Sequence, residues 1–136
     1  MNEITEEWVA KAESDYDLAD LALTGRESPI VEGVCFHSQQ CVEKYLKAYL
    51  KEHEIRFPPA HPLEPLIRLC LAVDAEFETL RLDLERLDFY VVRIRYPGAP
   101  TITEELAHQA FADATRVRAF VRPKLGLDPP VDDTPV

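Results

Sequence analysis

Residues 29–53, PIVEGVCFHSQQCVEKYLKAYLKEH, have the longest helical periodicity in the chain and decide its fold. Their apolar residues recur three or four positions apart and form a stripe about half the circumference of a helix wide. Two or three neighbouring helices are needed to cover such a stripe. The sequence therefore predicts a central, largely buried helix on which the rest of the chain packs.

A polar edge borders this apolar stripe. Its members are three or four residues apart, so their side chains stack along one side of the helix: His37, Gln40, Lys44, Lys47 and Lys51. For Gln40, Lys44 and Lys47, a solvated helix surface and a surface for a ligand or partner both remain open. His37 is either a hydrogen-bonded residue at the border of the core or a general acid or base, because its reference pKa is near neutrality.

Composition limits the classes of protein that this edge could serve. The chain has 136 residues, 46% hydrophobic and 29% charged, which predicts one soluble globular domain. No apolar run approaches the roughly 18 residues of a membrane span, and the acidic start lacks the features of a signal peptide. We therefore expect a cytoplasmic protein with no membrane segment. A net charge of −10 argues against a general nucleic-acid-binding surface and leaves only a local basic patch.

The three cysteines give no sign of a disulfide or a metal site. Cys35, Cys41 and Cys70 show neither CxxC spacing nor a companion pair of histidines, so we expect small core residues. The sequence also contains no glycine-rich phosphate loop and no cluster of metal ligands. We therefore expect neither a metal nor a cofactor.

Further helical periodicity predicts helices over 3–24, 63–73, 75–95 and about 101–124, the last opened by a capping box of Thr101 and Glu104. No segment shows the alternation of a strand, and the connections are short. We therefore predict an all-α fold, an up-and-down four-helix bundle with one additional short helix. This domain spans 1–125, and an acidic, proline-rich segment, 126–136, should form a disordered tail.

Three charged residues fall on or beside the apolar faces of these helices: Asp15, Asp88 and Arg95. A carboxylate without a partner would be costly there, so Asp15 should have one, and Asp88 and Arg95 could meet a charged group from another helix. We favour a structural ion pair between Asp15 and Arg95 across the bundle. The alternative is that Arg95 faces a cleft beside Lys44 and binds a ligand. Asp88 is interpreted as a structural polar residue.

Four motifs together resemble the HEPN family: AESDYDLADLAL at 12–23, FHSQQCVEKYLKAYL at 36–50, His61-Pro62-Leu63, and IRYPG at 94–98. The resemblance covers the chain to about Leu125. It implies a four- or five-helix bundle, often dimeric, that is encoded beside minimal nucleotidyltransferases in toxin–antitoxin, defence and RNA-processing systems. It also implies a surface for a ligand or partner, made of His37, Gln40, Lys44, Lys47, Arg95 and Tyr96.

Many HEPN proteins are metal-independent ribonucleases in which an arginine is followed, four to six residues later, by a histidine near the start of a late helix. Here YPGAP follows Arg95, and the next histidine is His108. Arg56 and His61 have the nuclease spacing, but they lie in a proline-rich loop. His37, Arg95, Arg56 and His61 are thus weak catalytic candidates, and we expect no RNA cleavage.

Three functions follow from these observations. The preferred one is a HEPN module that binds a nucleotide or docks a minimal nucleotidyltransferase. The second is a ribonuclease toxin, acting on RNA, whose site is built across a dimer from Arg95 and His37 or from Arg56 and His61. The third is a purely structural helical partner. We also expect a homodimer, because Phe36, Leu82 and Phe89 lie off the main helical stripes.

Overall fold

A computed structural model describes residues 1–59, 61–94, 97–98 and 101–127. Within them lie the helices α1 (Glu3–Thr24), α2 (Val31–Glu52), α3 (Leu63–Val73), η1 (Ala75–Leu80), α4 (Arg81–Ile94) and α5 (Glu104–Lys124), of which η1 is a 3-10 helix. These residues contain no strand, so the predicted all-α class is confirmed. None of the helices described is long and apolar enough to cross a membrane. The predicted tail, 126–136, lies almost wholly outside the described residues.

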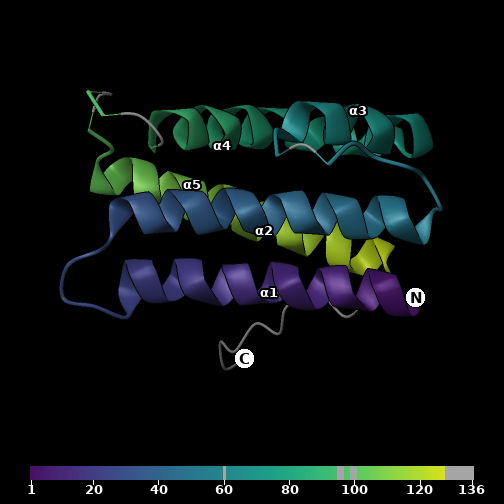
Figure 1. The fold of residues 1–136 in the computed structure, drawn as a ribbon, viewed down its shortest axis with the longest axis horizontal. Helices are drawn as coiled ribbons and strands as arrows, with labels where there is room; N and C mark the ends of the chain where they lie inside the picture. Colours follow the sequence, from purple (N-terminus) through teal and green to yellow (C-terminus); the bar gives the residue numbers. More distant parts are fainter. Residues whose placement is uncertain (60, 95–96, 99–100, 128–136) are drawn as a thin grey trace, which may run out of the picture.

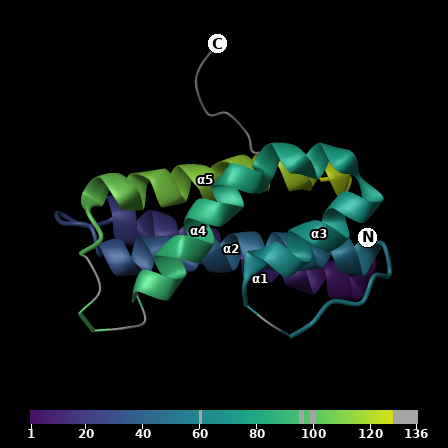
Figure 2. The ribbon, with the colours of Figure 1, turned by 90° about the horizontal axis from the view of Figure 1, so that it is seen from above.

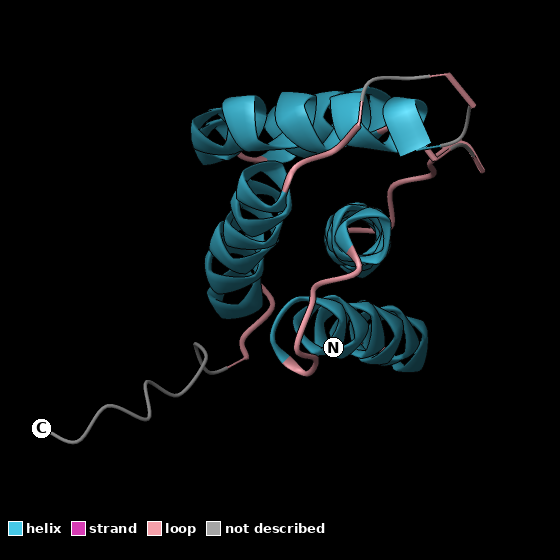
Figure 3. Cartoon of the chain, turned by 90° about the vertical axis from the view of Figure 1, so that its left-hand side faces the viewer, coloured by secondary structure: helices cyan, strands magenta, loops and turns pink. Residues whose placement is uncertain are grey.

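Helix α2 is the centre of the molecule, as its sequence predicts. It contacts α1, α3, α4 and α5, and Figure 1 shows it between α1 on one side and the α3 and α4 layer on the other. Figure 2 shows α4 crossing over α2 at an angle, while α5 runs along the bundle. Seen along the bundle in Figure 3, helices lie on several sides of the one viewed end-on. Because α2 is covered from several directions, most of its residues are buried.

Two predicted helix starts are wrong. Residues 75–80 form the 3-10 helix instead of the first turns of α4, because the Asp74 carboxylate accepts a hydrogen bond from the Glu76 N–H at 2.9 Å and caps a tight turn. Helix α5 is capped by Thr103 instead of Thr101, and the Thr103 hydroxyl accepts from the Leu106 N–H at 3.2 Å. The intervening Ile102 is buried in the core, which delays entry into the helix.

The cysteines behave as small apolar residues, as predicted. Cys35, Cys41 and Cys70 are all buried free thiols. Burial raises the pKa of the Cys35 thiol and of the Cys70 thiol to about 12. Both therefore stay protonated near neutral pH and pack without charge.

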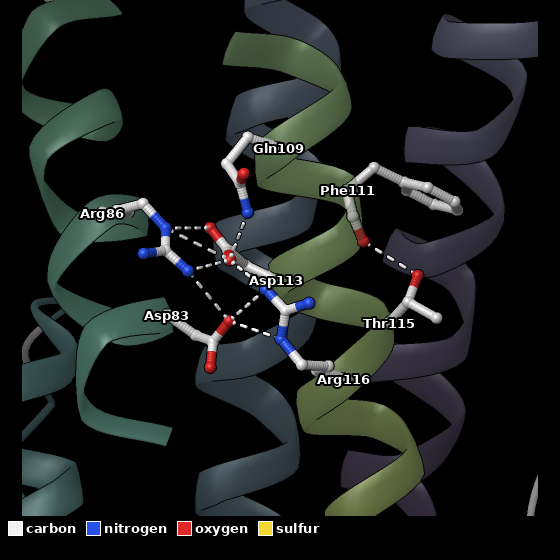
Figure 4. Close-up of polar contacts among 7 residues, drawn as sticks. All are labelled: Asp83, Arg86, Gln109, Phe111, Asp113, Thr115 and Arg116. Carbon is white, nitrogen blue, oxygen red and sulfur yellow. Dashed lines mark hydrogen bonds and ion pairs between the residues drawn. The ribbon is translucent and has the colours of Figure 1, made fainter. Parts of the chain in front are cut away.

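Helices α4 and α5 are joined by a network of two aspartates and two arginines, shown in Figure 4. The fully buried Asp113 accepts hydrogen bonds from Arg86 at 2.7 Å and from Arg116 at 2.9 Å. Arg116 also donates to Asp83 at 2.7 Å. Burial raises the pKa of Asp113, although the Arg86 hydrogen bond opposes this. The network fixes the α4–α5 pair and so completes the cover of α2.

Candidate functional site

The predicted polar edge of α2 begins with three residues that we call the Asp15 cluster: Asp15, His37 and Lys44. Asp15 is buried on α1, and its Oδ1 lies 2.8 Å from His37 Nδ1. Lys44 donates from its Nζ to the other oxygen, Oδ2. His37 and Lys44 are two helical turns apart, so each carboxylate oxygen holds one of them. The prediction that Asp15 has a partner is confirmed, and both of these partners come from α2.

Only one of the two ring nitrogens of His37, Nδ1, contacts Asp15. A carboxylate can only accept a hydrogen bond, so Nδ1 carries the proton in the contact with Asp15 and Nε2 is left for another partner. The side chains of His37 and Lys44 are 28% and 22% exposed, so both can be reached from solvent. Asp15 therefore holds an imidazole and an ammonium in fixed positions at the surface of the bundle.

Two glutamines continue this edge toward the loop before α3. Gln40 donates from Nε2 to Gln39 Oε1 at 2.9 Å. Gln39 is buried and donates in turn to the backbone carbonyl of His61 at 2.9 Å. The predicted edge residue Gln40 is thus tied through Gln39 to the loop that carries His61.

A second group on α2 has the same composition, and we call it the Glu43 cluster: Glu43, Lys47 and His61. Glu43 Oε1 lies 3.1 Å from His61 Nδ1, and Lys47 Nζ donates to Oε2 at 3.4 Å. The His61 side chain is 58% exposed, whereas the Lys47 side chain is only 7% exposed. The Lys47 ammonium lies 5.4 Å from the centre of the Trp8 ring and 5.6 Å from that of Phe57. A solvated surface is therefore the wrong interpretation for Lys47.

Asp88 has a partner that supports its structural interpretation. Its carboxylate accepts two hydrogen bonds from the Leu63 N–H, at 3.0 and 2.9 Å. The N-cap residue of α3 is Pro62, whose side chain cannot cap, so Asp88 supplies the missing acceptor from α4. Burial raises the pKa of Asp88, and the hydrogen bond from Leu63 counters part of the shift.

The two residues with nuclease spacing have different surroundings. His61 faces Glu43, whereas the exposed Arg56 lines a hollow beside Asn2 and Lys51. No hydrogen bond or ion pair among the described residues joins Arg56 to His61. The other predicted residues, Arg95 and Tyr96, lie outside the described residues, and so does the predicted pair of Asp15 with Arg95.

Several buried or half-buried polar residues are not predicted by the helical periodicity. Arg118 binds Glu13 through two hydrogen bonds of 2.7 and 2.6 Å, and the Tyr45 hydroxyl donates to the same carboxylate. Burial raises the pKa of Glu13, but the hydrogen bonds from Arg118 and Tyr45 outweigh it, and the pKa lies below its usual value. The Glu43 and Asp113 groups are also missed. For Asp113, the available signal was a charged residue on the apolar face of its helix, whereas Glu43 lies opposite the apolar stripe of α2 and gave no such signal.

A shallow hollow of about 390 Å³, which we call the His37 hollow, adjoins the Asp15 cluster. Exposed apolar side chains of Leu18, Leu21 and Ile30 line it, together with Arg26 and His37. The Arg26 Nε donates to the Ser28 carbonyl at 3.2 Å, which holds the guanidinium near this rim. His37 thus belongs both to the polar cluster and to an apolar depression.

The fold agrees with the comparisons with known proteins. A family model for the HEPN domain matches residues 5–124, so the chain belongs to the HEPN family. The chain is also similar to the crystal structure of an archaeal HEPN homologue, with 28% identity and a TM-score of 0.71 over 92% of this chain and 99% of that one. Among curated proteins, none matches significantly. The resemblance inferred from the four motifs is confirmed.

Proposed function

We propose that this HEPN protein binds a nucleotide at the Asp15 cluster. The observation that carries the proposal is the position of His37, which lies both in the cluster and on the wall of the His37 hollow. A flat base fits against the apolar side chains of Leu18, Leu21 and Ile30, and a phosphate fits beside cationic or hydrogen-bonding groups. His37 stands where these two environments meet.

The phosphate groups would lie along α2 from His37 toward Lys44. These residues are seven positions apart, which is about 10 Å along a helix and suits a short phosphate chain. Gln40 lies between them on the same edge. Asp15 holds both His37 and Lys44 in place, so little side-chain freedom is lost when the ligand binds. Arg26 adds a further cation to the lining of the hollow.

Docking of a minimal nucleotidyltransferase is a second candidate function for the same surface. It is favoured by the exposed apolar side chains of Leu18 and Leu21 on α1, of Phe36 on α2, and of Ile30, the N-cap residue of α2. The homodimer remains a prediction on similar grounds, since Phe36, Leu82 and Phe89 are exposed. The predicted absence of RNA cleavage also remains to be tested.

Calorimetric titration with ATP and with AMP tests the nucleotide proposal. His37→Ala should weaken binding about tenfold or more, because one charge-assisted contact is lost. The loss of folding free energy should stay below about 1 kcal/mol, because Lys44 still pairs with Asp15. His108→Ala, at an exposed position on α5, is the matched control and should bind as the wild type does. Equal affinity of the His37→Ala and wild-type proteins would contradict the proposal.

Phe36→Ser separates the two candidate functions. Phe36 is exposed and does not line the His37 hollow, but its ring lies edge-on to the His37 ring, with ring centres 5.2 Å apart. Nucleotide affinity should therefore fall much less in this variant than in His37→Ala. Co-purification with a nucleotidyltransferase encoded by an adjacent gene should be lost if that protein docks on the apolar surface.

A further inference from the structure

A second hollow, of about 570 Å³, lies at the far end of α2, and we call it the Lys51 hollow. Its walls come from the start of α1, the end of α2 and the loop that follows, and they include Asn2, Ile4, Lys51, Ile55, Arg56 and Phe57. Among the described residues, it shares no lining residue with the His37 hollow. Its volume is within the range of small-molecule sites.

The side chains of the two cations of the Lys51 hollow lack partners among the described residues. Neither the Lys51 ammonium nor the Arg56 guanidinium has a hydrogen bond or an ion pair with any residue that the structure describes. The chain has 25 acidic residues against 15 basic ones, so two basic side chains without an ion pair at one hollow are unusual in this protein. The hollow also contains one acid, Glu54. The N-cap residue of α1, Asn2, belongs to the same lining.

A strained turn brings the two cations together. At the end of α2, the Ile55 N–H donates to the Leu50 carbonyl at 2.9 Å and the Glu54 N–H donates to the Lys51 carbonyl at 3.1 Å. This turn requires a left-handed residue, usually glycine, and here Glu54 adopts it with a φ of 56°. The turn reverses the chain, so Arg56 returns to the same hollow as Lys51. Such strain is often found at binding sites.

The remaining wall of the hollow is apolar. Ile4 is exposed, and Ile55 and Phe57 are half-buried. The Phe57 ring is backed by Trp8, with ring centres 6.0 Å apart in an edge-to-face arrangement. The hollow therefore combines a cationic rim with an apolar wall that is fixed from behind.

We infer that the Lys51 hollow binds a small organic anion, with its charged head group on Lys51 and Arg56 and its apolar or aromatic body on Ile4, Ile55 and Phe57. A bare inorganic anion would leave the apolar wall in water, and an uncharged ring would leave the two cations without a counter-charge. Only a molecule that carries both parts satisfies the whole hollow. The inference does not depend on nucleotide binding at His37.

Phenyl phosphate, inorganic phosphate and phenol are the probes that separate these contributions. The chain has a single tryptophan, so the indole N–H signal of Trp8 in an NMR spectrum reports on the back of the Phe57 wall. In titrations of the full chain, phenyl phosphate should bind at least about tenfold more tightly than either inorganic phosphate or phenol. Comparable binding of phenyl phosphate and inorganic phosphate, or no binding of phenyl phosphate, would overturn the inference.

Two variants and a matched control complete the experiment. Lys51→Ala combined with Arg56→Ala should weaken phenyl phosphate binding about tenfold or more. Ile4→Ser, at an exposed apolar position, should weaken phenyl phosphate binding but leave inorganic phosphate unaffected. Lys11→Ala removes an exposed cation of α1 that does not line the hollow, so it should have no effect. Circular dichroism confirms that each variant is folded, and an equal loss with Lys11→Ala would reject the site.

Discussion

The Asp15 cluster and the Glu43 cluster contain the same three kinds of group, a carboxylate, a histidine and a lysine, yet they are built differently. In the Asp15 cluster, the acid comes from α1, and both partners come from α2 and reach solvent. In the Glu43 cluster, the acid and the lysine are one turn apart on α2, and the lysine is sealed under Trp8 and Phe57. Only the histidine, His61, is largely exposed.

The difference separates a group that can meet a ligand from one that holds the fold together. A lysine enclosed by aromatic rings cannot turn toward a phosphate without breaking its ion pair and leaving a charge buried. Lys44 is at the surface and can contact a ligand while it remains bound to Asp15. The contrast supports the proposal that a ligand binds at the Asp15 cluster, and it indicates a structural role for the Glu43 cluster.

Glu43→Ala should have the largest effect on stability. It leaves the buried Lys47 ammonium without its carboxylate, which costs about 3–5 kcal/mol in the free energy of unfolding. Urea denaturation measures the loss, and Glu7→Ala, at an exposed position on α1, is the control and should change little. The double variant Glu43→Leu with Lys47→Met should recover much of the loss. A cost below about 1 kcal/mol for Glu43→Ala would show that Lys47 finds water or another partner.

Asp15→Ala should have a smaller effect, about 1–2 kcal/mol in the same measurement. His37 and Lys44 lose their common acceptor, but both side chains can turn to water. Asp17→Ala, at an exposed position two residues along α1, is the control. Equal losses for Asp15→Ala and Glu43→Ala would remove the contrast between the two clusters.

The two clusters also show which features of α2 can be predicted from the sequence and which cannot. The helical spacing of α2 predicts its burial and the edge of His37, Gln40 and Lys44, because both depend only on the period of one helix. Lys47 has the same spacing as Lys44, yet Trp8 and Phe57 cover it. Which residues cover a helix depends on how the neighbouring helices are oriented about their own axes and on the path of the connecting loops. The periodicity of a single helix contains no information on either.

The partners of buried acids were hard to predict for the same reason. Asp15 was correctly expected to need a partner, but its partner His37 is 22 residues away on another helix. Glu43 and Gln39 were missed because a helical wheel treats a polar residue as facing outward. Both are buried because the loop before α3 brings the backbone and side chain of His61 to them.

A double-mutant cycle between the two histidines should show the smallest effect. His37 and His61 belong to different carboxylates, so the stability losses of His37→Ala and His61→Ala should add within about 0.5 kcal/mol. The link through Gln40 and Gln39 is the route by which they could interact. A coupling free energy above about 1 kcal/mol would mean that the two clusters act as one site.

The most direct test of the account is an NMR titration with ATP that follows the imidazole C–H signals of the four histidines, His37, His53, His61 and His108. We expect the His37 signals to move in a saturable manner and those of His61, His53 and His108 to stay in place. Movement of His61 without His37, or no movement of His37 at any concentration of ATP, would contradict the assignment of binding to the Asp15 cluster.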